Sequence, residues 1–132
     1  MRNGIKDAFE MLGIVSKLDK IIKLRKKYDF KGESIPVSEK YSIEYRKILK
    51  TCYILLNNNR LIQYNYGNIR RGAGAFKAGA TLGILKSSIF FVTKDKTVAN
   101  HKTVKDISNT LTDKMSEIEK YLQNASNNKW GV

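Results

Sequence analysis

A stretch rich in glycine and alanine, residues 69–92, constrains the fold more than any other part of the sequence. Small residues recur in it at every fourth position, namely Ala75, Gly79, Gly83 and Ser87. In a helix these positions form one narrow stripe along which a second backbone can approach closely. Glycine costs about 1 kcal/mol relative to alanine inside a helix, so such a stripe needs a compensating contact, or else the glycines mark a loop. The spacing favours a helix over residues 74–86.

The same stretch is long enough to cross a bilayer, but it contains Lys77 and Lys86. Each lysine near the bilayer centre costs about 2.5 to 3.5 kcal/mol, whereas each strongly apolar residue returns only about 0.3 to 0.6 kcal/mol. A buried or interfacial segment is therefore predicted. Residues 74–81 also have the spacing of a phosphate-binding P-loop, but Ala80 occupies the position of the essential lysine, so the glycines are interpreted as packing or turn residues.

Length and composition indicate one globular domain. The chain has 132 residues, of which 42% are hydrophobic, and it contains a single proline. A chain of this length buries roughly two-thirds of its unfolded surface. We expect residues 1–132 to form one domain with a frayed C-terminal tail over 123–132.

The formal net charge of +13 favours an anionic partner. The positive excess is concentrated in residues 1–31 and 61–102, whereas residues 103–132 are neutral. Nucleic acid, anionic lipid and an acidic protein all fit this charge. The alternative is that the lysines reflect the general composition of an AT-rich genome.

The hydrophobic residues between positions 3 and 28 fall on one side of a helical wheel and predict an amphipathic helix. The opposite side carries a ridge of four lysines, Lys17, Lys20, Lys23 and Lys27. This ridge is interpreted either as a phosphate-binding surface or as a plain solvated face. Basic residues near the end of a helix also suit its dipole.

A second helix is predicted over residues 38–58, with Ser38 as its N-cap. At helical spacing the segment has one apolar arc, made of Tyr41, Tyr45, Ile48, Leu49, Cys52, Leu55 and Leu56. Ile43 and Ile54 then point away from this arc. Asn57 to Asn59 end the helix, because asparagine tolerates the left-handed conformation.

The best candidate for a binding site follows, between residues 60 and 71. It contains Arg60, Tyr64, Tyr66, Arg70 and Arg71. Aromatic residues interleaved with arginines can stack bases and hold phosphates. The alternative is that both tyrosines are half-buried packing groups and the arginines are simply solvated.

Two further elements are predicted in the last third of the chain. Residues 88–99 form either a short β-hairpin or the end of a helix. A last helix is expected over 103–124, with Thr103 as its cap. Its hydrophobic residues form a narrow seam that fits one neighbouring helix, including the same helix of a second subunit. The seam positions chosen for self-association are Leu111, Met115, Ile118 and Leu122.

The predicted fold is therefore mainly α, a bundle of about four helices at 3–28, 38–58, 74–86 and 103–124. A short β-hairpin near residues 88–99 is allowed for. The predicted core comprises Leu12, Val15, Leu18, Ile22, Ile48, Leu49, Cys52, Leu56, Leu111, Met115 and Ile118.

An enzyme is the least supported class of function. The chain has one histidine, His101, and one cysteine, Cys52, so catalytic acid–base pairs, thiol nucleophiles and metal sites lack their usual partners. No cofactor is implied. The N-terminus has no apolar core or cleavage site typical of a signal peptide, so we expect the protein in the cytoplasm or in a particle assembled there.

The sequence favours a small basic nucleic-acid-binding protein with an accessory, packaging or virion-type role, which contacts mainly the phosphate backbone. Two alternatives remain. One is a helical protein that binds an anionic membrane surface or an acidic partner protein. The other is a structural subunit that self-assembles through the seam of its last helix.

Overall fold

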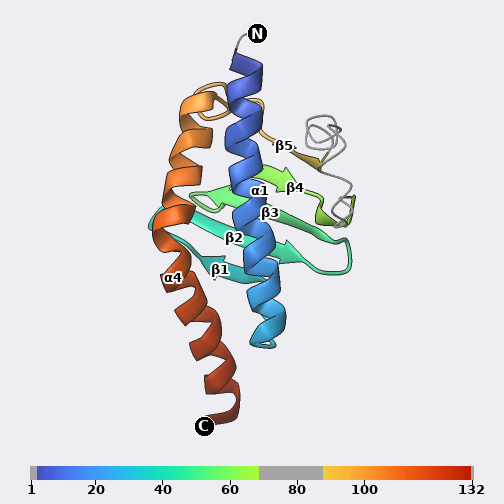
Figure 1. Cartoon of the computed structure of the whole chain (residues 1–132), viewed down its shortest axis with the longest axis vertical. Helices are drawn as coiled ribbons and strands as arrows, with labels where there is room; N and C mark the ends of the chain where they lie inside the picture. Colours follow the sequence, from blue (N-terminus) through green and yellow to red (C-terminus); the bar gives the residue numbers. More distant parts are fainter. Residues whose placement is uncertain (1–2, 69–87, 132) are drawn as a thin grey trace.

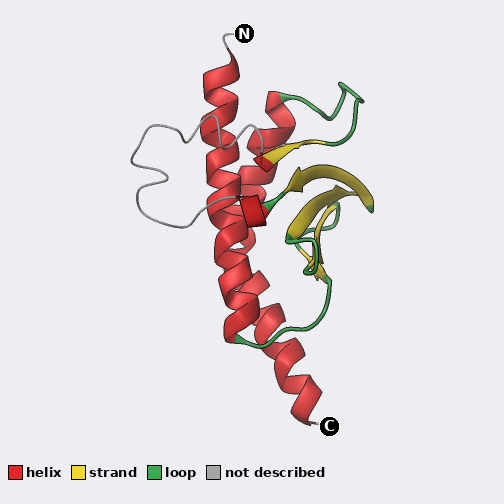
Figure 2. Cartoon of the chain, turned by 90° about the vertical axis from the view of Figure 1, so that its right-hand side faces the viewer, coloured by secondary structure: helices red, strands yellow, loops and turns green. Residues whose placement is uncertain are grey.

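The computed structural model describes residues 3–68 and 88–131, which form two layers. One layer is an antiparallel sheet with strand order β1-β2-β3-β4-β5, and two long helices lie across one of its faces (Figures 1 and 2). The elements in chain order are α1 (Asn3–Lys27), β1 (Ser34–Pro36), β2 (Tyr41–Arg46), β3 (Thr51–Leu56), β4 (Asn59–Tyr64), the 3-10 helix η1 (Tyr66–Asn68), β5 (Ile89–Phe91) and α4 (His101–Gly131). The predicted four-helix bundle is therefore wrong.

The first and last predicted helices are present. Helix α1 coincides with the predicted helix 3–28, and α4 covers the predicted helix 103–124 and continues to Gly131. The cap of α4 is Asn100 instead of Thr103, because the Oδ1 atom of Asn100 accepts a hydrogen bond of 3.0 Å from the backbone N–H of Thr103. Neither helix in the described residues combines the length and the apolar character of a membrane span.

The predicted helix 38–58 is instead the hairpin of β2 and β3. Residues 41–46 alternate in burial, and Tyr41, Ile43 and Tyr45 face the helices. This period of two is that of a strand with one buried face. Ile43 and Ile54, which the helical interpretation placed outside the core, are directly paired in register and almost fully buried.

The helix-facing side of the sheet consists of two cross-strand rows. Ile35, Ile43, Ile54 and Ile62 form the first row, and Tyr45, Cys52, Tyr64 and Ile89 form the second. All eight side chains are buried. β-branched and aromatic side chains pack well across neighbouring strands, so these rows form the core against which α1 and α4 lie.

Two predicted core positions are wrong. Ile48 is 94% exposed and Leu49 is 60% exposed, because both lie in the turn between β2 and β3. Of the other predicted core residues, those that are buried are Val15, Leu18, Ile22, Cys52, Leu111 and Ile118, and those that are only partly buried are Leu12, Leu56 and Met115.

The asparagines after β3 close a hairpin instead of ending a helix. Asn57 and Asn58 have φ angles of 51° and 68°, and they are the two residues between β3 and β4. Two consecutive positive φ angles are typical of the type I′ turn, whose twist matches that of the paired strands.

The last strand, β5, pairs with β4 through Tyr64↔Ile89 and does not form a local hairpin within 88–99. The predicted helix 74–86 and the rest of residues 69–87 lie outside the described residues.

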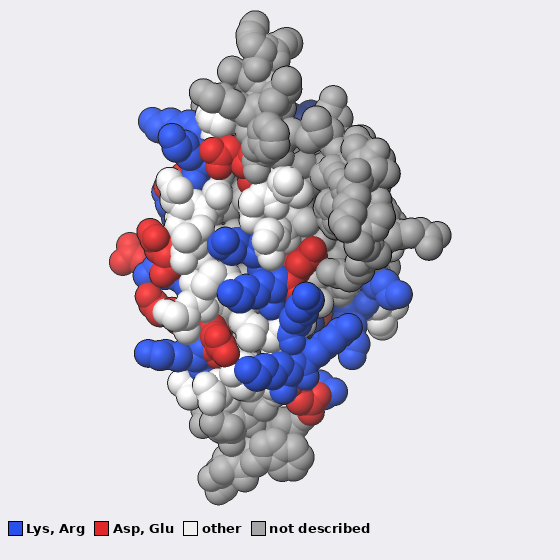
Figure 3. Space-filling model, viewed as in Figure 1, with Lys and Arg blue, Asp and Glu red and all other residues white. Residues whose placement is uncertain are grey.

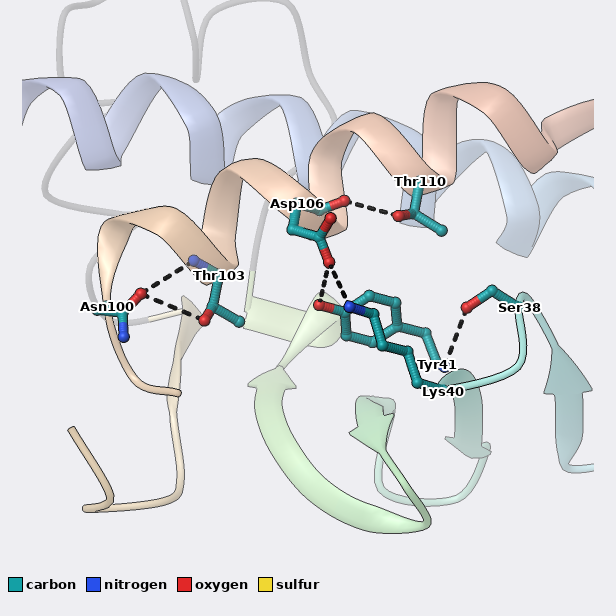
Figure 4. Close-up of polar contacts among 7 residues, drawn as sticks. All are labelled: Ser38, Lys40, Tyr41, Asn100, Thr103, Asp106 and Thr110. Carbon is teal, nitrogen blue, oxygen red and sulfur yellow. Dashed lines mark hydrogen bonds and ion pairs between the residues drawn. The ribbon is translucent and has the colours of Figure 1, made fainter. Parts of the chain in front are cut away.

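Polar contacts attach the start of β2 to α4 (Figure 4). The Tyr41 hydroxyl donates a hydrogen bond of 2.7 Å to Asp106 Oδ2, and Lys40 Nζ lies 3.1 Å from the same oxygen. The Tyr41 hydroxyl, followed by Lys40, lowers the pKa of the Asp106 carboxyl, and burial together with Asp106 raises the pKa of Tyr41 above its usual range. Both pKa shifts show that the contact favours a neutral Tyr41 phenol beside an ionised Asp106 carboxylate.

The hairpin assignment predicts opposite outcomes for two aliphatic residues. We expect Ile54→Ala to lower the free energy of unfolding by about 2 to 5 kcal/mol, because it leaves a cavity in the isoleucine row. Leu49→Ala should change it by less than about 0.5 kcal/mol, because the side chain is in solvent. Urea unfolding of both variants measures this difference, and equal losses would contradict the β2–β3 hairpin.

The Tyr41–Asp106 contact predicts a pH dependence of stability. The lowered pKa of Asp106 gives a contribution that is present at neutral pH and is lost as the pH falls through the folded-state pKa. The raised pKa of Tyr41 gives a contribution that is lost above about pH 10. In Tyr41→Phe both limbs of the stability–pH curve should become shallower than in the wild type, whereas the control Tyr121→Phe should keep them. Identical curves for Tyr41→Phe and wild type would rule out this contact.

Candidate functional site

A groove lies beside the C-terminal half of α1, between this helix and the β2–β3 turn. Its volume is about 970 Å³. Four segments line it: residues 22–26 of α1, the connection 29–33, the end of β2 with the turn 45–50, and η1 with Tyr66 and Gly67. Tertiary folding thus brings together segments that are far apart in the sequence.

The groove is strongly cationic. Seven basic side chains line it, namely Lys23, Arg25, Lys26, Lys31, Arg46, Lys47 and Lys50, against two acidic ones, Asp29 and Glu33. In the described part of the chain only Lys31 among these cations forms an ion pair, at 3.0 Å from Asp29. Figure 3 shows Lys and Arg side chains gathered over the lower half of α1 and to its right, which is the side where the β2–β3 turn lies in Figure 1.

The β2–β3 turn presents an apolar tip between these cations. Ile48 and Leu49 form this tip, with Lys47 and Lys50 on either side. Hydrogen bonds of 3.1 Å from Leu49 N to Arg46 O and from Lys50 N to Lys47 O close the turn, so the backbone that carries the tip is fixed.

Gly67 in η1 contacts the backbone of the β2–β3 turn. Its N–H donates a hydrogen bond of 3.3 Å to Lys50 O. A Cβ atom at this position would lie 2.9 Å from Lys50 Cβ, so only glycine allows this close approach.

Arg25 forms part of the groove wall and is held by aromatic rings. Its guanidinium carbon lies 4.4 Å from the centre of the Tyr45 ring and 5.6 Å from that of Phe30. Its Nη2 atom donates a hydrogen bond of 2.6 Å to Gly32 O. Its Nε atom is buried and has no hydrogen-bond partner among residues 3–68 and 88–131. The guanidinium is thus oriented by its neighbours, and one of its donors is not used.

The structure separates the residues of the predicted site at 60–71. Tyr64 is fully buried, and its hydroxyl donates a hydrogen bond of 2.6 Å to Asp19 on α1, so its ring is not available to stack on a base. Tyr66 is half-buried at the groove wall, with its ring 6.2 Å from those of Tyr45 and Tyr64. Arg70 and Arg71 lie outside the described residues.

Arg60 lies outside the groove. Its guanidinium forms a bidentate contact with Glu44, at 2.9 and 3.1 Å, and lies 4.0 Å from the centre of the Tyr53 ring. This contact lowers the pKa of the Glu44 carboxyl. The charge of Arg60 is therefore neutralised by Glu44 on the surface of the sheet.

The lysine ridge contributes one residue to the groove. Lys20, Lys23 and Lys27 are exposed and Lys17 is half-buried, but only Lys23 lines the groove. Lys27 Nζ lies 5.2 Å from the centre of the neighbouring Tyr28 ring.

The seam of α4 packs in the core of the same chain. Leu111, Ile118 and Leu122 are buried in the common core, and Met115 packs against that core. A second subunit cannot bind these side chains without displacing their present neighbours. Self-association remains an untested prediction, but these residues do not offer a surface for it.

Cys52 is a core residue in the second cross-strand row, and burial raises the pKa of its thiol well above the usual range. Among residues 3–68 and 88–131, no group of three or more His, Cys, Asp or Glu side chains lies close enough to hold a metal ion.

Sequence reasoning missed most of the groove. The local signal was the run Arg46-Lys-Ile-Leu-Lys50, in which cations flank two apolar residues. A helical interpretation buries the apolar pair and spreads the cations over the helix surface. The cations and the exposed apolar pair form one surface only if this run is a turn.

Comparison of the chain with known protein families, with curated proteins and with solved structures gives no match. What the groove binds therefore has to follow from the chemistry of its own side chains.

Proposed function

We propose that the protein binds peripherally to anionic membrane surfaces, with the apolar tip of the β2–β3 turn in the lipid and the groove cations on the headgroups. The observation that carries this proposal is the 94% exposure of Ile48 at the apex of a closed turn with lysines on both sides. An exposed apolar pair within a cationic surface matches the two layers of a membrane interface, charged outside and hydrocarbon beneath.

The magnitudes support such binding. Half-inserting Ile48 and Leu49 contributes about 1.5 to 3 kcal/mol, since full burial of each side chain is worth about 1.5 to 3 kcal/mol. Each lysine or arginine near an anionic bilayer adds about 1 kcal/mol, so four of them add about 4. The total of about 5.5 to 7 kcal/mol corresponds to a dissociation constant of roughly 10 to 100 µM. Either contribution alone gives only millimolar binding or weaker.

The nature of the tip favours lipid over nucleic acid. An aliphatic wedge enters a duplex only by unstacking bases, which costs a few kcal/mol per step. That cost is similar to the free energy gained by burying the tip. Insertion into lipid hydrocarbon gains the same free energy and requires no unstacking. The cytoplasmic leaflet carries the anionic lipids, so we place the protein on that leaflet, as a binding protein and not an enzyme.

The tip gives the sharpest prediction. The double variant Ile48→Ser, Leu49→Ser should bind vesicles containing phosphatidylserine roughly 10- to 100-fold more weakly, since it loses about 1.5 to 3 kcal/mol of apolar burial. Sedimentation with vesicles measures the bound fraction. The matched control is Val92→Ser, which removes an apolar side chain that is 39% exposed and does not line the groove.

Val92→Ser should bind like the wild type. Unchanged binding of the Ile48→Ser, Leu49→Ser variant would exclude insertion of the tip. Absence of wild-type binding to anionic vesicles at low salt would exclude the proposed function as a whole.

Nucleic-acid binding is the second candidate, supported by the seven cations of the groove together with the exposed lysines of the α1 ridge. Contacts to about six phosphates would give a slope near −5 in log affinity against log salt concentration. Lys23→Gln together with Lys47→Gln should make this slope shallower by about two units for any probe sequence. Fluorescence anisotropy with single- and double-stranded probes measures the slope, and no binding at low salt removes this candidate.

A further inference from the structure

We propose that the groove is a binding site for a dianionic phosphate group, with Arg25 as its anchor and with Lys26 and Lys47 as flanking contacts. This inference rests on the proposed function and adds the class of headgroup. A dianionic phosphate group is present both in a phosphomonoester on a lipid headgroup and in a soluble phosphate or pyrophosphate.

The charge of Arg25 is not compensated by an acidic side chain in the described part of the chain. Arg25 is half-buried. A partly buried charge without a counter-ion costs free energy. The buried Nε–H, for which the described residues provide no acceptor, is a second uncompensated group on the same side chain. An anion bound at the accessible part of the Arg25 guanidinium would compensate its charge.

The Arg25 guanidinium is preorganised for an anion. The rings of Tyr45 and Phe30 hold the guanidinium, whose central carbon lies 4.4 and 5.6 Å from their centres. Gly32 O also accepts a hydrogen bond of 2.6 Å from Nη2. The orientation of the planar group is therefore fixed before a ligand arrives. A fixed guanidinium loses little conformational entropy on binding, and its fork of donors matches phosphate geometry.

The positive charge of the groove suits a ligand with more than one negative charge. The groove has seven basic side chains and only two acidic ones, one of which is paired with Lys31. A carboxylate or a phosphodiester brings a single negative charge, whereas a phosphomonoester brings about 1.5 to 2 at neutral pH. Lys26 and Lys47 approach from different elements and are both exposed, so they are free to close on such a group.

The test uses the full chain with two sets of vesicles of equal surface charge. One set contains phosphatidic acid, which is a phosphomonoester, and the other contains phosphatidylserine, which is a phosphodiester. The wild type should prefer phosphatidic acid by about tenfold, the effect expected for one set of charge-assisted hydrogen bonds. Arg25→Lys keeps the charge but loses the fork, so the ratio of the two affinities should fall to about one.

Exposed residues provide variants that do not threaten the fold. Lys26→Gln together with Lys47→Gln should also lower the preference for phosphatidic acid. Lys105→Gln removes an exposed lysine of α4 that does not line the groove, and it should leave the preference unchanged.

A soluble arm separates the two sources of phosphate. Pyrophosphate is titrated into ¹⁵N-labelled protein while the Arg25 Nε–H resonance is observed, and a saturable shift that is weaker in Lys26→Gln, Lys47→Gln supports the site. Binding of pyrophosphate without binding to either vesicle keeps the phosphate site and rejects the membrane function. Equal binding to both vesicle sets with no pyrophosphate shift keeps the membrane function and overturns the phosphate site.

Discussion

The structure depends on burying one face of a sheet whose side chains carry both hydrocarbon and hydroxyl groups. The isoleucine row supplies the apolar contact, and the tyrosines of β2 and β4 add hydrogen bonds from their hydroxyls to the two helices. Tyr45, for example, is fully buried and reaches the backbone carbonyl of Leu18 on α1 at 3.3 Å. A buried hydroxyl without a partner is costly, so these bonds also fix where each helix lies on the sheet.

This placement creates the groove. Helix α1 crosses the sheet so that its last turns lie beside the β2–β3 turn (Figure 1). The basic residues Arg25, Lys26 and Lys27 in the last turn of α1 are partly explained by the negative end of the helix dipole. The dipole does not explain Lys47 and Lys50, which lie on a β-turn, nor the two apolar residues exposed between them. The turn is therefore the part of the groove that most needs a functional explanation.

The sequence allowed the two long helices to be predicted because their hydrophobic period of 3.6 residues continues over many turns. Residues 41–56 fit two periods at once, since Tyr41, Tyr45 and Cys52 lie on one face in a helix and also in a pair of strands. The asparagines at 57 and 58, between two apolar runs, were the local evidence for a hairpin. The groove could not be predicted, because Arg25, Lys47 and Gly67 come together only through the packing of α1 and the closure of the β2–β3 turn.

We propose above all that the tip enters the hydrocarbon of an anionic membrane. This insertion is tested most directly by Ile48→Trp in a Trp130→Phe background, with the emission of the new tryptophan recorded as vesicles containing phosphatidylserine are added. If the tip is inserted, the emission should shift to shorter wavelength and should be quenched by lipids brominated near the headgroup end of the acyl chain. An unchanged emission spectrum, when sedimentation shows that the protein is bound, would contradict insertion.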